Sequence, residues 1–276
     1  MTCPICAGAE AREIPCSRRY TAGWPIHVCA GCGLVHVRAR RGSDAIARVW
    51  SDELFADSPD PKSVLYQATL PAVLARLTYV AATLDQSVGL KDRAVIDIGA
   101  GTGVFLDLAK ARGARTFGIE PSAANCARLR AQGHGCHEGT VESYAAGGGA
   151  DLVTILWTLE NTSDPRAMLA AAHRALADDG RLCVATGSRI LVPFKKPLDY
   201  YLGEGNPDIH PFHWSAATLA AILAVAGFRV TWTNSYIDSD VLCVIATKGA
   251  AEWTGDHPDA VLAFFDRWDR ETSHYG

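Results

Sequence analysis

Short apolar runs alternate with amphipathic segments through residues 91–248 of the chain. Runs rich in β-branched residues predict buried strands, and these lie at 95–98, 116–119, 136–138, 151–156 and 182–186. Apolar positions at helical spacing predict helices between them, over 104–112, from 122 to about 133 and over 165–177, with a turn at 178–180. Strands that alternate with helices in this way indicate a doubly wound α/β sheet.

The pattern changes after residue 186. Residues 187–215 are long and irregular for a simple connection, and such segments often carry function. A helix over 215–226, closed by Gly227, and two antiparallel strands at 228–236 and 241–247 are expected to complete the domain. We therefore expect an acceptor-site insert at 187–215 within a domain of residues 91–248.

The two ends of the chain have patterns of their own. Residues 43–90 predict a helical connector, with helices at 44–56 and 63–86 that either cap a cleft or cover the sheet. Residues 249–276 predict a helical tail. Its aromatic residues Phe264, Phe265 and Trp268 are expected to pack back on the core, although a partner contact is an alternative.

The first 42 residues contain two CxxC pairs, Cys3 with Cys6 and Cys29 with Cys32, separated by 22 residues. Each pair can direct two thiolates at one metal ion, and two pairs complete a tetrahedral zinc shell. Four sulfur ligands leave no open position, so this zinc would be structural. We therefore expect a zinc ribbon over residues 1–42.

The charge, the hydrophobic pattern and the cysteine content of the chain exclude several classes of protein. The 276 residues carry a formal net charge of −4, which argues against a broad electrostatic grip on nucleic acid. No signal peptide or apolar run of about 20 residues is seen, so we expect neither secretion nor membrane spanning. Nine cysteines without a secretion signal suggest a reducing cytoplasm, where clustered cysteines favour metal over disulfides. The oligomeric state is not encoded in any readable pattern.

The strand at 95–98 runs directly into the glycine-rich turn Gly99-Ala100-Gly101-Thr102-Gly103. Glycines let the backbone approach a ligand closely, and the helix that follows offers free N–H groups. The next strand ends in Glu120, 21 residues after Gly99, where a carboxylate can accept hydrogen bonds from both ribose hydroxyls. The sequence therefore predicts a cofactor that contains a nucleoside.

The spacing of the glycines shows whether the turn suits a dinucleotide cofactor. A dinucleotide fold uses G-x-G-x-x-G, but this chain has G-x-G-x-G and Val104 at the third dinucleotide position. Asp97 lies two residues before the first glycine, where it would repel a pyrophosphate but could face an ammonium group. An NAD-dependent oxidoreductase is therefore disfavoured.

These segments together resemble the class I S-adenosylmethionine-dependent methyltransferases, whose sheet has seven strands. DIGAGTGVFL resembles their motif I, GIEPS their motif II and DLVTILWTLENTSDP their motif IV. Relatives commonly carry L-E-H-x-x-D-P in motif IV, and Asn161 stands here in place of the histidine. The resemblance implies that S-adenosylmethionine is bound by Asp97, Gly99, Ala100, Gly101, Gly103, Glu120, Pro121, Thr140, Val141, Glu142 and Trp157.

The ribbon and the segment before residue 215 resemble the zinc-ribbon sugar C-methyltransferases, which act on nucleotide-linked ketosugars. Their H-E-H-x-x-x-F-S pattern aligns with residues 208–215, and His210 stands at its second histidine. Asp208 and Ile209 replace the first two residues of the pattern, and we expect this chain to lack the added carboxy-terminal domain. Lys195 and Lys196 could meet phosphates, while the aromatic residues Tyr200, Tyr201, Phe212 and Trp214 could form the walls of a sugar or ring site.

The resulting hypothesis is methyl transfer to a small-molecule acceptor, such as a nucleotide-linked sugar, a polysaccharide precursor or a secondary metabolite. His210 is the candidate general base, with Glu160 and Tyr201 as alternatives. Two other hypotheses on the function remain. One is an RNA methyltransferase with a zinc module, which only the basic stretch at 38–41 favours. The other is a non-catalytic scaffold that uses the ribbon and the tail as interaction surfaces.

Overall fold

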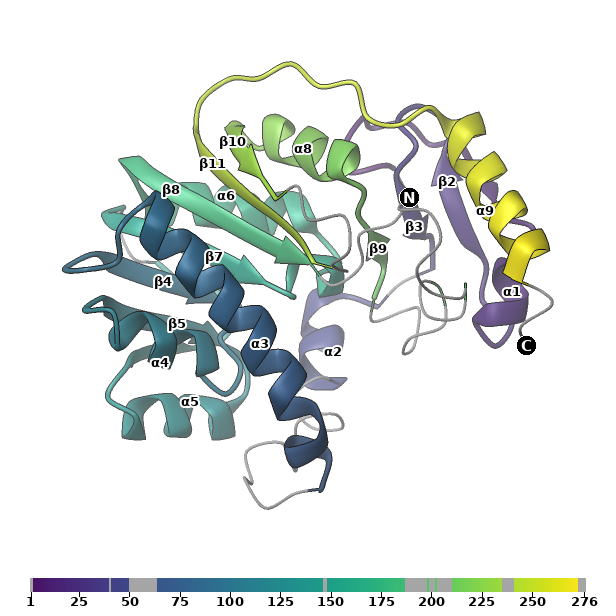
Figure 1. Ribbon diagram of the computed structural model, residues 1–276. Helices are drawn as coiled ribbons and strands as arrows, with labels where there is room; N and C mark the ends of the chain where they lie inside the picture. The colour runs from purple at the N-terminus through teal and green to yellow at the C-terminus, as the bar shows by residue number, and fades with distance from the viewer. Residues whose placement is uncertain are drawn as a thin grey trace.

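The computed structural model describes residues 2–39, 41–49, 64–145, 148–186, 198, 202, 210–234 and 241–272. Within these residues the strands form a seven-stranded and a four-stranded sheet (Figure 1). Tyr201 and most of the 187–215 segment lie outside the described residues. The described part contains no helix that is long and apolar enough to cross a membrane.

The seven-stranded sheet is doubly wound, as the alternation of apolar runs predicts. Its strands are β4 (Ala94–Ile98), β5 (Arg115–Glu120), β6 (Gly135–Glu138), β7 (Ala150–Leu156), β8 (Leu176–Thr186), β10 (Phe228–Thr233) and β11 (Leu242–Lys248). They lie in the order β10-β11-β8-β7-β4-β5-β6. β11 is antiparallel to both of its neighbours, whereas β8, β7, β4, β5 and β6 are mutually parallel. This arrangement confirms the α/β class and the antiparallel pair at the end of the domain.

Helices cover both faces of this sheet (Figure 1). One face carries α3 (Val64–Ser87), α4 (Val104–Lys110) and α5 (Ala123–Ala131), and the other carries α6 (Pro165–Ala175) and α8 (Ala216–Val225). The caps explain where helices begin: the side chain of Ser122 accepts the Asn125 N–H, and Asp164 accepts the Ala167 N–H before Pro165 starts α6. The helices cover the two faces of the sheet with apolar side chains, so a ligand site is expected at the ends of the strands.

β8 differs from the prediction of a turn at residues 178–180. The strand is continuous from Leu176 to Thr186, and Leu176 pairs with Ala150 while Arg181 pairs with Leu152. The register shift between Ala150 and Leu152 accommodates the extra residues of β8 as a bulge. The Asp-Asp-Gly signal therefore marks an irregularity within the strand.

The four-stranded sheet includes the amino-terminal strands between and after the two CxxC pairs, and Cys29 is the last residue of β2. It consists of β1 (Ala11–Glu13), β2 (Ile26–Cys29), β3 (Val35–Val37) and β9 (Phe212–His213), all antiparallel and in that order, with α1 (Ser17–Tyr20) between β1 and β2. The edge strand β9 comes from the segment that the sequence assigns to the acceptor site. The sequence did not predict this shared sheet, because two residues give no strand pattern.

The carboxy-terminal helix α9 (Pro258–Thr272) packs on the ribbon, and not on the seven-stranded sheet (Figure 1). Its buried residues Val261, Phe265 and Trp268 belong to the same apolar cluster as Ile26 and Val28 of β2. The tail thus packs back on a core of the chain as expected, but that core is the apolar cluster of the ribbon and not the core of the seven-stranded sheet. The helix is strongly amphipathic, but periodicity alone does not say which surface its apolar face covers.

Candidate functional site

The carboxyl ends of β4, β5 and β7 surround a cavity of about 460 Å³. The chain continues from β4 to β5 on one side and later returns to β7 on the other, so this is the point where strand order reverses. Open α/β sheets bind ligands at such a point. Two further elements contribute to the walls, α3 and the short helix α2 (Ser43–Arg48).

Glu120, the last residue of β5, lines this cavity with a side chain that is 6% exposed. Its two carboxylate oxygens accept the backbone N–H groups of Gly101 and Ser122, each at 2.9 Å. Burial raises the pKa of Glu120, while these two hydrogen bonds lower it. The carboxylate is thereby fixed beside the glycine turn, where it can accept further hydrogen bonds from a ligand.

Asp97, in β4, is a second buried carboxylate in the lining. Its Oδ1 accepts the hydroxyl of Thr154 at 2.6 Å. Burial raises its pKa to about 7, and the nearby charge of Glu120 adds to the rise. A cationic ligand group at this point would favour the ionised form, so Asp97 is suited to face an ammonium group.

The three glycines of the turn have different surroundings. A Cβ on Gly99 would lie 2.4 Å from Oγ1 of Thr158, so this glycine permits a close approach between two loops. Gly101 has a φ of +53°, and a Cβ there would meet no atom within 4 Å, so it borders open space in the cavity. Gly103 is not among the lining residues; a Cβ there would lie 2.5 Å from Leu129 Cδ2, so it permits the packing of α4 against α5.

Most of the residues expected to contact the cofactor line this one cavity. They include Asp97, Gly99, Ala100, Gly101, Glu120, Pro121, Thr140, Val141, Glu142 and Trp157. Thr140 precedes the 3-10 helix η2 (Val141–Ser143), which follows β6 and closes one side. The buried carboxylates, the open glycine turn and this loop together fit a nucleoside with a cationic amino-acid end.

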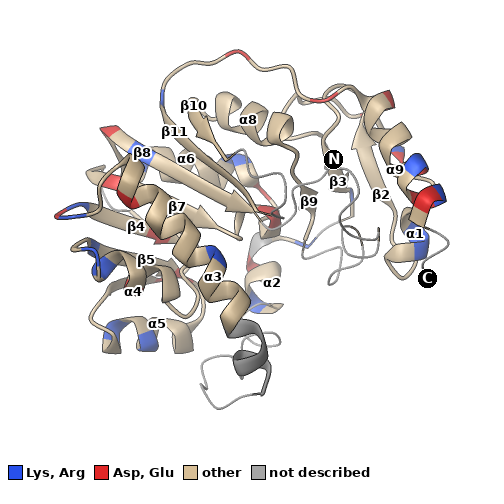
Figure 2. Ribbon diagram, viewed as in Figure 1, with Lys and Arg blue, Asp and Glu red and all other residues tan. Residues whose placement is uncertain are grey.

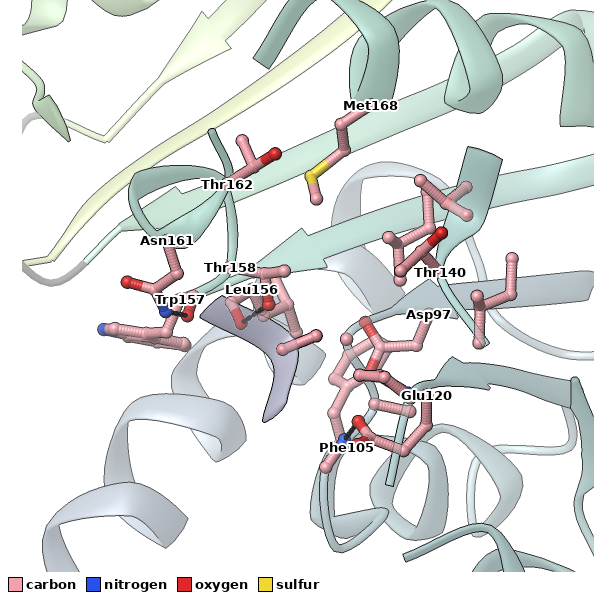
Figure 3. Close-up of a pocket in the computed structure, with 18 of the residues that line it drawn as sticks. Asp97, Phe105, Glu120, Thr140, Leu156, Trp157, Thr158, Asn161, Thr162 and Met168 are labelled. Atoms are coloured by element: carbon pink, nitrogen blue, oxygen red, sulfur yellow. Dashed lines mark hydrogen bonds between the residues drawn. The ribbon is translucent and has the colours of Figure 1, made fainter. Parts of the chain in front are cut away.

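The opposite side of the cavity is formed by the 3-10 helix η3 (Leu159–Asn161) and the residues before it (Figure 3). Trp157 has an unusual φ of +53°, and the Asn161 amide N–H₂ donates to the Trp157 carbonyl at 3.0 Å. Within the described structure, the buried indole Nε1 of Trp157 and Oδ1 of Asn161 have no hydrogen-bond partner. In Figure 3 these two side chains lie on the side of the cavity away from Asp97 and Glu120. They are therefore suited to contact a second ligand.

Two of the three candidate bases, His210 and Glu160, line the same cavity. Burial lowers the pKa of His210 to about 4, so its imidazole is neutral and able to accept a proton at physiological pH. Glu160 lies in η3, with 5% of its surface exposed. Tyr201, the third candidate, lies outside the described residues.

The aromatic walls expected in the 187–215 segment differ from the prediction. Phe212 and Trp214 are 1% and 0% exposed and pack on each other with ring centroids 5.4 Å apart. They belong to the main apolar cluster and cannot form the wall of a ligand site. Lys195, Lys196, Tyr200 and Asp208 lie outside the described residues.

Several lining residues were not identified from the sequence. They are contributed by α2, α3, α6 and the residues on either side of η3: Ile46, Ala47, Val73, Arg76, Leu77, Thr158, Thr162 and Met168. The sequence predicts that the helix at 63–86 either caps a cleft or covers the sheet, and it does not identify Val73 or Leu77 as cavity residues. Among the described lining residues, Arg76 is the one arginine or lysine.

The four cysteines of the two CxxC pairs converge in the ribbon. Their sulfur atoms all lie within 4.8 Å of one another, and Cys3–Cys32 and Cys6–Cys29 are each 3.5 Å apart. A tetrahedral zinc with Zn–S bonds of about 2.3 Å would hold its sulfurs about 3.8 Å apart. The donor set therefore fits a metal ion with a closed coordination shell.

The basic side chains in the last turns of α4 and α5 lie away from the cavity. Lys110 is in the last turn of α4, and Arg128 and Arg130 are in the last turn of α5 (Figure 2). These helices run antiparallel to the strands they connect, so their last turns lie at the edge opposite the strand carboxyl ends. Positive charge on this face is therefore not directed at the site.

Comparisons with known proteins agree with this geometry. A family model described as a methyltransferase domain matches residues 66–232. The ubiquinone biosynthesis O-methyltransferase of Pseudomonas aeruginosa (strain UCBPP-PA14) is 30% identical over 116 residues, which cover 38% of this chain and 49% of that protein. The chain thus spans about half the length of the curated relatives it matches first.

Two solved structures share the fold over most of their length. The 1,6-didemethyltoxoflavin-N1-methyltransferase of Burkholderia thailandensis, with S-adenosylhomocysteine bound, has a TM-score of 0.59 at 17% identity and covers 80% of this chain and 96% of its own. The magnesium protoporphyrin IX methyltransferase of Synechocystis PCC 6803, also with bound S-adenosylhomocysteine, has a TM-score of 0.58 at 18% identity and covers 75% and 99%. With the family match, these likenesses show that the chain belongs to the methyltransferase family and has the class I S-adenosylmethionine-dependent fold.

Proposed function

We propose that this protein transfers the methyl group of S-adenosylmethionine to a small-molecule acceptor. The observation that carries the proposal is a single cavity that contains both the Glu120 and Asp97 pair and the candidate base His210. A volume of about 460 Å³ falls in the range of small-molecule sites. The cofactor, when bound, supplies a methyl group on an activated sulfonium.

The protein residues have mainly orienting roles in this proposal. Glu120 accepts hydrogen bonds from the ribose hydroxyls, and Asp97 faces the ammonium group of the methionine end. Gly101 leaves space for the cofactor, while Pro121, Thr140 and Val141 border the adenine. Because methyl transfer is an in-line displacement, orientation supplies much of the rate.

His210 takes the proton of the acceptor nucleophile at the unprotonated nitrogen of its neutral imidazole. A neutral imidazole can do this without first losing its own proton, and the lowered pKa keeps it neutral. Glu160 is the alternative base, because it lines the same cavity. Tyr201 remains a sequence-based candidate.

The described lining favours a small acceptor that contains a ring and little negative charge. The acceptor side presents apolar groups from Val73, Leu156, Trp157 and Met168. The lining carboxylates outnumber the one guanidinium, Arg76, so a multiply charged anion would meet repulsion. The names of the similar proteins refer to ubiquinone biosynthesis, protoporphyrin and didemethyltoxoflavin, which are also ring compounds.

A nucleotide-linked sugar is the second candidate acceptor. Its support is the amino-terminal ribbon together with His210, which stands at a histidine of the sugar C-methyltransferase pattern. Such an acceptor needs cations for its diphosphate, and Lys195 and Lys196 are the residues that would supply them.

We also propose that the four cysteines hold a structural zinc ion and that residues 1–42 form the ribbon, 43–90 a connector that caps the cavity, 91–248 the catalytic domain and 249–276 the tail. The closed set of four thiolates supports zinc without a catalytic role. The position of Ile46 and Arg76 in the cavity lining supports a capping role for the connector. An RNA acceptor has less support, since the basic residues of α4 and α5 lie at the far edge of the sheet.

The test is methyl transfer from radiolabelled S-adenosylmethionine to two acceptor panels, one of hydroxylated aromatic rings and one of nucleotide-linked sugars. We expect turnover with members of the first panel and its loss in His210→Ala. Turnover restricted to the second panel would replace the ring acceptor by the sugar. If the protein binds the cofactor but methylates no member of either panel and no RNA, the result would favour the hypothesis of a non-catalytic scaffold.

A further inference from the structure

The strand that follows His210 is an integral part of the cysteine ribbon. The N–H of Val37 donates to the carbonyl of Pro211 at 2.9 Å. In the ladder that follows, His36 lies opposite Phe212 and Val35 lies opposite His213. The backbone next to His210 is thus hydrogen-bonded to β3, a strand far away in the sequence.

The position of β3 is set in turn by the second cysteine pair. The N–H of Cys29 donates to the carbonyl of Leu34 at 2.9 Å, and the N–H of Gly33 donates to the carbonyl of Cys29 at 3.0 Å. These bonds close the loop that carries Cys32, and β3 begins at Val35 directly after it. A metal ion that fixes Cys29 and Cys32 would therefore also fix the start of β3.

The other end of β9 is attached to the same loop through Asp256. The hydroxyl of Ser215, which caps α8, donates to the Asp256 carboxylate, and the Asp256 N–H donates to the carbonyl of Cys32 at 3.0 Å. A Cβ on Gly33 would lie 2.6 Å from the Asp256 carbonyl oxygen, so the two backbones are in close contact. Both ends of the segment from Pro211 to Ser215 are thus held by the ribbon.

β9 also contacts the helix η3, which carries two residues of the cavity wall. Phe212 of β9 and Leu159 of η3 belong to one apolar cluster. The residues that hold the cofactor end, Asp97 and Glu120, come from β4 and β5 and are hydrogen-bonded within the main sheet and its loops. The ribbon is therefore joined to the acceptor side through the backbone of β9, whereas the carboxylates of Asp97 and Glu120 are held by hydrogen bonds from the main sheet and its loops.

We propose that the cysteine ribbon is a positioning element of the acceptor site, which holds His210 in place through β3, β9 and the Ser215–Asp256 bridge. This inference rests on the proposed role of His210 as the base. Asp256 acts through other residues and does not touch the ligands. Disruption of the bridge should release His210 and leave the cofactor end intact.

The test uses the zinc-loaded full chain and the variant Asp256→Ala. Asp256→Asn is the conservative variant, because it keeps an oxygen that can accept the Ser215 hydroxyl. Glu252→Ala is the matched control, since Glu252 is an exposed acid in the same segment. Three quantities are measured: the affinity for S-adenosylhomocysteine by calorimetry, the pKa of the His210 imidazole by NMR, and the hydrogen exchange rate of the Val37 amide.

In Asp256→Ala we expect the His210 pKa to move up toward its ordinary value and the Val37 amide to exchange about tenfold faster. The affinity for S-adenosylhomocysteine should stay within about twofold of wild type. Asp256→Asn and Glu252→Ala should match wild type in all three. The proposal is overturned if Asp256→Ala changes neither the pKa of His210 nor the exchange rate of the Val37 amide. It is also overturned if Asp256→Ala weakens S-adenosylhomocysteine binding by about tenfold, the factor expected for Val37 exchange.

A variant that does not fold is identified by its circular dichroism spectrum, and removal of the metal from wild type by a chelator then serves as the perturbation, with the same expectations. None of these readouts requires acceptor turnover. The role of His210 as the base is tested separately, because full activity of His210→Ala would contradict it. The measurements on Asp256→Ala would then still decide whether the ribbon positions His210.

Discussion

The carboxylate of Glu120 accepts the backbone N–H of Gly101 at 2.9 Å, so the end of β5 is fixed against the glycine turn that follows β4. The second oxygen accepts the N–H of Ser122, which holds the side chain toward the cavity (Figure 3). Two adjacent strands thus present one buried acceptor and one open backbone turn at the same edge. This pairing is the basis of the proposed cofactor site.

Alanine substitutions at Gly99 and Gly101 should have different consequences. A Cβ at Gly99 meets the Thr158 side chain at 2.4 Å, so Gly99→Ala should lower the free energy of unfolding by about 2–3 kcal/mol. Gly101→Ala meets no atom, so only its left-handed backbone should cost stability, about 1 kcal/mol, but its Cβ enters the cofactor space. Urea denaturation and calorimetry measure the two effects; equal stability losses with unchanged affinity for both variants would contradict this assignment.

Cofactor affinity should depend on pH through Asp97. Its pKa of about 7 leaves much of it protonated in neutral solution, whereas a bound ammonium group favours the ionised carboxylate. Binding of S-adenosylhomocysteine should therefore weaken as pH falls from 8 to 6 and release up to about half a proton at pH 7. Calorimetry in buffers of different ionisation enthalpy measures this release, and Asp97→Asn should abolish it. A wild-type affinity that is constant over this range would argue against an ammonium partner for Asp97.

The rate of methyl transfer should stay high well below neutral pH. His210 must be neutral to accept a proton, and burial lowers its pKa to about 4, so kcat/KM for the acceptor, measured at saturating S-adenosylmethionine, should fall only as pH drops toward that value. The measurement is a pH profile with an acceptor that wild type methylates, with His210→Gln as the comparison. An acidic limb near the ordinary histidine pKa of about 6.5 would place a different or more exposed group in this role.

Much of the fold could be predicted because its signals are local. Val95, Ile96 and Ile98 form an apolar run that only Asp97 interrupts, and Ser122 and Asp164 are capping residues at the helix starts that the structure contains. The glycine spacing and Glu120 also lie within one strand-helix-strand unit, so their spacing along the chain determines their spacing in space. These features required no knowledge of long-range packing.

The acceptor side could not be predicted in the same way, because it is assembled from distant segments. Arg76 comes from the connector and Met168 from α6, and neither has a local pattern that points to a cavity. Phe212 was expected in a ligand wall but is buried, since β9 pairs with the ribbon strand β3. A two-residue edge strand is decided by its partner and not by its own sequence.

Zinc loss should destabilise the chain without removing a catalytic group. Wild type is expected to hold one zinc per chain, and Cys32→Ser should lose it and lower Tm by roughly 10 °C, as each kcal/mol corresponds to roughly 2–4 °C in domains of this size. Cys16→Ser is the matched control, because Cys16 is a buried ribbon cysteine outside the four-sulfur cluster. Elemental analysis with thermal unfolding tests this. Zinc retained at full stoichiometry in Cys32→Ser would contradict the assigned ligand set.

The most direct test of the cofactor site is the affinity for S-adenosylhomocysteine of wild type, Glu120→Gln and Glu138→Gln, measured by calorimetry at pH 7.5. Glu138 is the matched control, since it lies opposite Glu120 in the ladder and is an exposed residue of the edge strand β6. Loss of hydrogen bonds to a charged acceptor should weaken binding to Glu120→Gln by about 30-fold or more. Glu138→Gln should bind as wild type does. Equal affinity of wild type and Glu120→Gln, or no binding by wild type, would contradict the proposed site.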